Sequence, residues 1–152
     1  WRSLKDTHDF FMMTRKFGVS RTQALRLAPE GFARKIENSK VVNLLEDASE
    51  KNVPIMAFVG NRGIIQIHTG EVKKTMWHQQ WFNVMDPDFN MHLDTTKIAE
   101  TWIVKKPTDD GEVTAIEVFN KKGDFIIQFF GKRKPGIPEL QEWKDLVKGL
   151  EN

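Results

Sequence analysis

The four histidines offer the widest choice of chemistry in this chain, which contains neither cysteine nor tyrosine. They are His8, His68, His78 and His92. Without thiols the chain forms no disulfide, thiolate metal site or cysteine nucleophile, so catalysis or ligand binding falls to His, Asp, Glu, Lys or Arg. Asp6, Asp9 and Asp94 lie near histidines, but their spacing matches no standard zinc pattern. Phosphate-loop, serine-elbow and His-Glu-x-x-His signatures are also absent.

His8 is the most informative histidine, because it falls in the first turn of a predicted amphipathic helix and precedes Phe10 and Phe11. A lone helix histidine most often packs and hydrogen-bonds within the protein. The alternative is a neutral imidazole that points into an aromatic-lined cleft, which is what a proximal haem ligand requires. Both interpretations remain open at this point.

Such a cleft needs flat apolar walls and cations at its rim for carboxylates, and the chain has side chains of both kinds. Phenylalanine is abundant, with eleven residues, and arginine and lysine bind carboxylates as a bidentate fork and as a point charge respectively. Candidate walls are Phe11, Phe58 and Phe130, and candidate cations are Arg21, Lys106 and Arg133. Spacing alone does not show that these residues converge.

A hairpin is predicted over residues 58–70. Apolar residues alternate from Val53 to Val59, and again at Ile65 and Ile67. Gly60 and Gly63 bracket Asn61-Arg62, where we expect residues that tolerate positive φ.

The remaining pattern indicates an α+β fold in which N-terminal helices and a C-terminal helix pack against a large antiparallel β-sheet, a meander. The first helix is expected to begin with Asp6 or Thr7 as its cap and to end at Phe17-Gly18, with Leu4, His8, Phe11, Met12 and Arg15 on one face. The other helices are expected at Arg21–Leu27 (capped by Ser20), Val41–Lys51 and Glu139–Leu150. Strands are expected near Val53–Val59, Ile64–His68, Glu71–Met76, Trp81–Met85, Asn90–Leu93, Ile98–Lys105, Val113–Phe119 and Phe125–Gly131.

Length and charge suit one globular domain over residues 1–152. The net charge is only +2, so nucleic-acid binding driven by bulk charge is not expected. No apolar run reaches membrane-span length and no signal peptide is visible, so we expect no membrane insertion and a cytoplasmic location. The basic run Lys132-Arg133-Lys134 is either a small-anion site or a solvated turn.

Motifs along nearly the whole chain resemble the HemS/ChuS/HmuS family of bacterial haem-utilisation proteins. They are Trp1-Arg2, Asp6-x-His8-x-Phe10-Phe11, Ser20-Arg21-x-Gln23-Ala24, Phe58-Val-Gly-Asn-Arg-Gly63, Trp81-Phe-Asn-Val, Phe89-Asn-Met-His-Leu93, Ile98-Ala-Glu-x-Trp102, Lys105-Lys106-Pro-Thr108 and Gly131-Lys-Arg-x-x-Gly136. Family members are normally two similar halves in tandem, and this chain resembles the C-terminal half.

The resemblance implies haem b as ligand, with His8 as the axial ligand of its iron. It also implies that Arg21, Lys106 and Arg133 surround the pocket near the propionates, and that Phe11, Phe58, Gln128 and Phe130 line the pocket or its channel. In the family an arginine from the N-terminal half makes a distal contact. Here water, a neighbouring protomer or a second histidine such as His92 would have to replace it, although an outward strand position is the commoner role for His92.

Two functions follow from the resemblance: a carrier that takes imported haem and transfers it, or an enzyme that opens the haem ring and releases iron. Because the distal half is missing, we favour binding and transfer. The implied partners are a haem-import permease or a haem oxygenase, and a homodimer is an alternative assembly. A domain that only mediates protein contacts is a third, unrelated interpretation, since one face of the sheet must be covered or become an interface.

Overall fold

The computed structural model describes all residues from 1 to 152. Its helices are α1 (Asp9–Phe17), α2 (Arg21–Arg26), α3 (Lys40–Glu50), the short 3-10 helix η1 (Thr95–Lys97) and α4 (Gln141–Leu150). Its strands are β1 (Ala33–Ile36), β2 (Ile55–Gly60), β3 (Ile65–Gly70), β4 (Thr75–His78), β5 (Trp81–Met85), β6 (Asn90–Asp94), β7 (Glu100–Thr108), β8 (Gly111–Phe119) and β9 (Phe125–Gly131).

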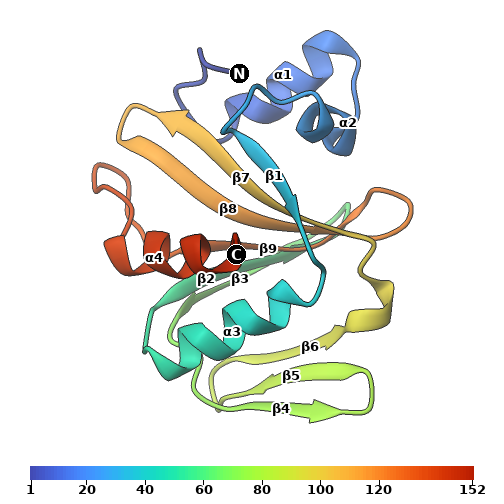
Figure 1. Ribbon diagram of the computed structural model, residues 1–152, viewed down its shortest axis with the longest axis vertical. Helices are drawn as coiled ribbons and strands as arrows, with labels where there is room; N and C mark the ends of the chain where they lie inside the picture. The colour runs from blue at the N-terminus through green and yellow to red at the C-terminus, as the bar shows by residue number, and fades with distance from the viewer.

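The strands form two antiparallel sheets. Six of them make a large sheet in the order β1-β7-β8-β9-β2-β3, and β4-β5-β6 make a smaller one. Figure 1 shows α1 and α2 at one end of the molecule and the small sheet at the other end. The α+β prediction with terminal helices on a large antiparallel sheet is confirmed.

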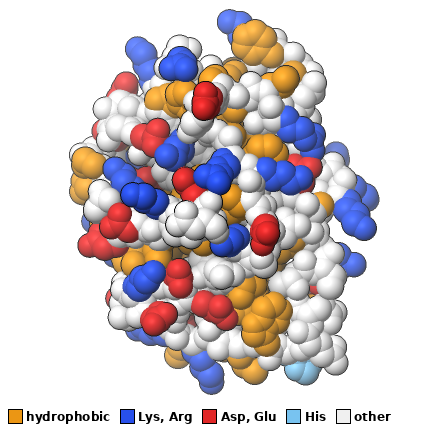
Figure 2. Space-filling view, in the orientation of Figure 1, with side chains coloured by type: hydrophobic (Ala, Val, Ile, Leu, Met, Phe, Trp, Pro, Cys, Tyr) orange, Lys and Arg blue, Asp and Glu red, His pale blue; other side chains and the backbone are white.

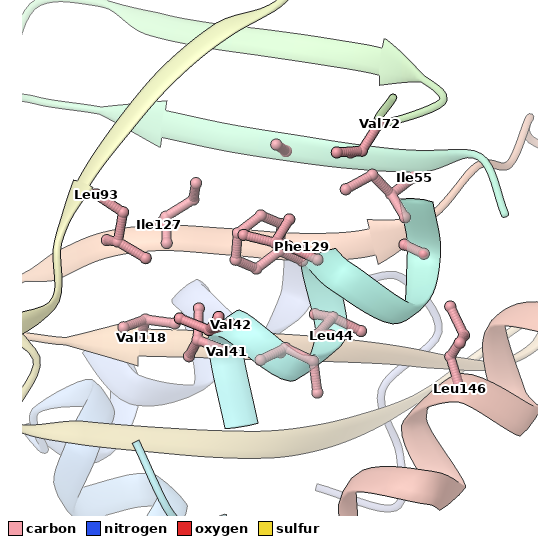
Figure 3. Packing of buried hydrophobic residues seen from close by; sticks show 14 of the residues in the cluster. Val41, Val42, Leu44, Ile55, Val72, Leu93, Val118, Ile127, Phe129 and Leu146 are labelled. Carbon is pink, nitrogen blue, oxygen red and sulfur yellow. The ribbon is translucent and has the colours of Figure 1, made fainter. Parts of the chain in front are cut away.

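The inner face of the large sheet carries the main core. A cluster of 23 buried residues joins it to α3, α4 and the small sheet. Phe129 of β9 is fully buried there, and Figure 3 shows its ring among side chains from α3 and the neighbouring strands. The inward positions predicted for the third helix, Leu44, Leu45 and Ala48, have no exposed surface.

The outer face is covered over only part of its width. Phe10 and Leu25 of α1 and α2 pack on Trp102 and Val104 of β7 in a second, smaller cluster. Beyond these helices the outer side chains of β2 and β3 are less covered, and Ile67 is 53% exposed. Figure 2 shows acidic and basic side chains interspersed over one face of the molecule, which agrees with the small net charge.

Two of the predicted helix boundaries follow local sequence signals. Gly18 ends α1 in the left-handed region at φ 63°, and the Ser20 side chain accepts a hydrogen bond from the Gln23 amide at the start of α2. The predicted cap of α1 is wrong, because His8 occupies the cap position without a capping side-chain bond. The predicted face of α1 also differs, since Phe10 is buried and Phe11 points outward.

Other differences have local causes. Strand β1 escaped prediction because it has only four residues, two of them charged, and pairs at the sheet edge with β7. Residues 71–74 are not a strand, because the Asp86 carboxylate accepts the Lys73 and Lys74 amides. The last helix begins at Gln141, two residues after Glu139.

The turn between β2 and β3 also differs from expectation. None of its residues adopts positive φ. Instead the Asn61 side chain accepts the amides of Gly63 and Ile64, and the Asn61 amide donates to the Ile64 carbonyl. Hydrogen bonds to the Asn61 side chain therefore close this turn, in place of the positive-φ residues that we expected.

None of the helices combines the length and hydropathy that crossing a bilayer would require.

The contact between Gly131 and Trp143 yields a stability prediction. A Cβ at Gly131 would lie 2.5 Å from Cγ of the fully buried Trp143. Gly131→Ala should therefore lower the free energy of unfolding by about 1–3 kcal/mol, the usual cost of overpacking, as measured by urea denaturation. Gly149→Ala on α4 is the matched control, because a Cβ there meets nothing within 4 Å. Equal stability of the two variants would contradict this packing argument.

Candidate functional site

The carboxylate of Glu117 lies at the centre of the outer face and gathers most of the predicted polar site residues. Glu117 is fully buried on β8. Arg21 donates to it through Nε (2.8 Å) and Nη2 (2.5 Å), and Lys106 Nζ donates at 2.9 Å. Gln128 Nε2 donates at 2.9 Å. Helix α2 and strands β7, β8 and β9 are therefore joined by one acidic side chain.

Strand register explains why Glu117 and Gln128 meet, and Lys106 reaches Glu117 from further along β7. Glu117 pairs with Trp102 on one side and Gln128 on the other, and Gln128 pairs with Phe58 of β2. Paired residues project from the same face of a sheet, so these side chains form one row across the outer face. Arg21 reaches the row from the first position of α2.

Aromatic rings enclose the cations of this cluster. The Arg21 guanidinium lies 4.6 Å from the centroid of the Phe10 ring and 4.7 Å from that of Phe125. Lys106 Nζ lies 4.9 Å from the Phe10 ring, and the residue is only 1% exposed. Cations stacked on desolvated rings gain additional stabilisation.

The pKa values follow from burial and charge. Burial by itself raises the pKa of Glu117, but the Lys106 and Arg21 charges and hydrogen bonds outweigh it and lower the pKa to about 2. Burial lowers the pKa of Lys106, the Glu117 carboxylate opposes that shift, and the Arg21 charge adds to it. Glu117 is consequently ionised at neutral pH.

An aromatic platform borders this cluster. Phe58 and Phe130 contact edge to face, with centroids 5.3 Å apart and planes at 76°. Both rings are half-buried on the outer face, on strands β2 and β9. Gln128, next to Phe58, connects the platform to Glu117.

His8 lies outside the core, just before α1. Its side chain is 95% exposed, and Nδ1 lies 2.5 Å from Oδ1 of Asp6. Hydrogen bonds from the His8 amide and ring lower the pKa of Asp6, and the Arg133 charge contributes to the same effect. A carboxylate on Nδ1 favours the tautomer whose Nε2 lone pair is free, as is usual for metal-bound histidines.

The predicted site residues thus fall into three groups. Arg21, Lys106 and Gln128 meet at Glu117, while Phe58 and Phe130 form the platform. His8 and Arg133 accompany Asp6 at the end of the sheet where β7 turns into β8, since Arg133 also lies 3.7 Å from Asp110. Phe11 joins none of these groups and is 60% exposed.

Sequence reasoning missed Glu117, although one signal was available. It is a lone acid inside the apolar segment Val113–Phe119. A charge in an otherwise buried strand needs partners of opposite charge, and the basic residues Arg21 and Lys106 supply them.

The other histidines lie elsewhere. His92, the alternative second ligand, is on β6 in the small sheet, where Nδ1 lies 2.7 Å from Asn83 Oδ1. Figure 1 places β6 at the opposite end of the molecule from α1. His68 stacks on Phe89 at 3.7 Å. No group of three or more His, Cys, Asp or Glu side chains could hold a metal ion.

The Glu117 cluster predicts a specific acid sensitivity. Since the pKa of Glu117 lies below its ordinary value of 4.5, the stability it contributes is fully present above pH 4.5 and is lost as the pH falls towards 2. The loss should be on the order of 3 kcal/mol, as measured by urea denaturation from pH 6 to pH 2. Glu117→Gln should be less stable at pH 6 and should flatten this acid dependence; an unchanged profile would contradict the assignment.

Comparison with known proteins places this chain in a family. The sequence profile of the haemin-degrading HemS.ChuX domain matches residues 18–150. The hemin transport protein HemS of Yersinia enterocolitica is 42% identical over 152 residues, which are 100% of this chain and 44% of that protein.

Solved structures agree. The heme-binding protein PhuS of Pseudomonas aeruginosa in its holo form has a TM-score of 0.97 at 51% identity, over 99% of this chain and 43% of PhuS. ChuS, an Escherichia coli heme oxygenase, has a TM-score of 0.97 at 39% identity, over 100% of this chain and 46% of ChuS. The chain spans less than half the length of these relatives and corresponds to a C-terminal half. Because the profile covers most of the sequence, this protein belongs to the HemS family of haem-utilisation proteins.

Proposed function

We propose that this chain binds haem b through His8 and carries or transfers it in bacterial iron acquisition. The observation that carries the proposal is the His8–Asp6 pair, in which a carboxylate holds Nδ1 and leaves an exposed Nε2 as an iron ligand. That donor set fits haem iron, for which a single imidazole is a common axial ligand. The holo form of PhuS, a relative at 51% identity, is a heme-binding protein.

The rest of the site supports the same ligand. The half-buried rings of Phe58 and Phe130 offer apolar surface for a flat macrocycle. Arg21 and Arg133 keep 22% and 19% of their side-chain surface exposed, so they can receive carboxylates from solvent. Phe11, exposed on α1 three residues after His8, is positioned to add a further apolar wall if the ligand spans both elements.

Haem carriage is favoured over ring opening on one structural ground, the accessibility of the outer face. Beyond α1 and α2 the outer side chains of β2 and β3 are partly exposed, as at Ile67. ChuS, a relative at 39% identity, is a heme oxygenase, so ring opening is the second candidate. In that reaction bound haem supplies the oxidative chemistry, and the residues of this chain orient it and limit water. A permease, a haem oxygenase or a second copy of this chain remain the proposed partners, and the cytoplasm the proposed location.

Removal of the His8 imidazole should remove most of the specific haem affinity. Titration of the protein with haemin should give a shifted Soret band. His8→Ala should weaken binding at least about tenfold, since loss of even an outer-shell partner of a metal ligand commonly costs 10–100-fold in affinity. His78→Ala, an exposed histidine on β4, is the matched control and should bind like the wild type. An identical Soret spectrum in His8→Ala would exclude His8, and no haemin binding by the wild type would favour a protein-contact domain.

Carrier and enzyme can be separated with the haem-loaded protein. With ascorbate in air and catalase present, a carrier should keep its Soret band over an hour, because a site that only holds haem does not turn it over. His8→Ala mixed with the same amount of haemin serves as the background for uncatalysed bleaching. Biliverdin-like absorbance that appears in the wild type and survives catalase would establish ring opening and show that carriage alone is an incomplete account of this protein.

A further inference from the structure

Glu117 is not among the residues proposed to contact haem. Its carboxylate nevertheless accepts hydrogen bonds from three residues predicted for the haem site, Arg21, Lys106 and Gln128. We infer that Glu117 is a positioning residue that sets recognition of one ligand carboxylate by fixing the Arg21 guanidinium. The inference rests on the proposed function and deepens it. Its basis is the set of four hydrogen bonds that the buried Glu117 carboxylate accepts from Arg21, Lys106 and Gln128.

Charge balance determines which cation is available to a ligand. Lys106 is 1% exposed and donates to Glu117, so its charge is matched inside the protein. Arg21 also pairs with Glu117, but 22% of its side-chain surface remains exposed. The buried cluster of two cations and one carboxylate therefore has one positive charge in excess, and Arg21 is the member that can present it to solvent. One excess positive charge matches the charge of one ligand carboxylate.

The orientation of Arg21 is fixed in two independent ways. The rings of Phe10 and Phe125 lie 4.6 Å and 4.7 Å from the guanidinium and restrict its plane. Within that plane, Glu117 takes Nε and Nη2, and no protein acceptor binds Nη1. Nη1 and the second N–H of Nη2 are thus the donors left for a ligand. Without the Glu117 carboxylate, the two rings would still restrict the plane of the Arg21 guanidinium. No hydrogen bond would then fix the rotation of the guanidinium within that plane.

Gln128 connects this arrangement to the platform. Its amide donates to Glu117, and its backbone pairs with Phe58, so the cluster lies beside the aromatic surface proposed for the macrocycle. A carboxylate at the edge of a ring seated on Phe58 and Phe130 would lie on the Arg21 side of the platform. The ligand class is consequently a flat apolar macrocycle with a peripheral carboxylate.

Glu100 provides a matched control on the same face of the sheet. It also joins α2 to β7, through Arg26, and it accepts a hydrogen bond from the indole of Trp102. None of its partners belongs to the proposed haem site. Substitution of Glu100 therefore removes a comparable link between helix and sheet without touching Arg21.

The test compares haemin with haemin dimethyl ester, which keeps the iron porphyrin but has no carboxylates. Dissociation constants are measured by Soret titration for the wild type, Glu117→Gln and Glu100→Gln. We expect the wild type to prefer the free acid and Glu117→Gln to lose about tenfold of that preference, the value of one charged hydrogen bond. Glu100→Gln should keep the wild-type ratio. The ratio of the two dissociation constants is informative because a merely structural defect would weaken the binding of haemin and of its dimethyl ester equally.

Each outcome decides the inference. A ratio in Glu117→Gln that equals or exceeds the wild-type ratio overturns it, as does an equal loss in Glu100→Gln. If Glu117→Gln does not fold, Glu117→Asp is compared with Glu100→Asp, since a shorter carboxylate keeps the charge but withdraws from the donors; an unchanged ratio there also overturns it. Failure of the wild type to bind haemin, or a spectrum independent of His8, refutes the proposed function instead.

Discussion

A buried carboxylate with four hydrogen bonds organises the outer half of this molecule. Burial of a charge is costly unless its partners are complete, and Glu117 is supplied by Arg21, Lys106 and Gln128. These donors come from α2, β7 and β9, so the same contact that satisfies the charge holds the N-terminal helices over one part of the sheet. The docking of α2 on the sheet is therefore coupled to the ionisation of Glu117, in addition to the apolar packing of α1 and α2 and the Arg26–Glu100 pair.

That position leaves the two faces of the sheet unequal. The inner face is closed by α3, α4 and the small sheet around Phe129. On the outer face α1 and α2 cover β7 and part of β8, and the side chains of β2 and β3 remain partly accessible. An apolar surface beside an ordered polar cluster is the usual composition of a ligand site, with apolar area for affinity and few polar groups for orientation.

At the end of the sheet where β7 turns into β8, an exposed histidine is oriented by a neighbouring carboxylate. His8 is exposed, so burial does not restrict its ring; the Asp6 carboxylate does so instead. The nearby Arg133 helps to keep Asp6 ionised. Metal affinity depends on this kind of support, because a hydrogen-bonded carboxylate fixes the tautomer and increases the basicity of the free nitrogen.

Much of the fold could be read from local pattern. Period-two and helical repeats located every long element, and Ser20 and Gly18 marked helix boundaries, because such signals act within a few residues. The four-residue strand β1 was missed because its stability comes from pairing with β7 and not from its own residues. The Asn61 turn differed because a side-chain acceptor replaced positive φ.

The sequence by itself determined the α+β class, the family resemblance and the residue types suited to a haem site. Only the tertiary structure decided that Arg21, Lys106 and Gln128, which lie far apart in the chain, meet at Glu117, and that Phe10 and not Phe11 faces the sheet. The reason is physical: strand register and helix docking set which distant side chains share one face, and neither is encoded in the spacing along a single element.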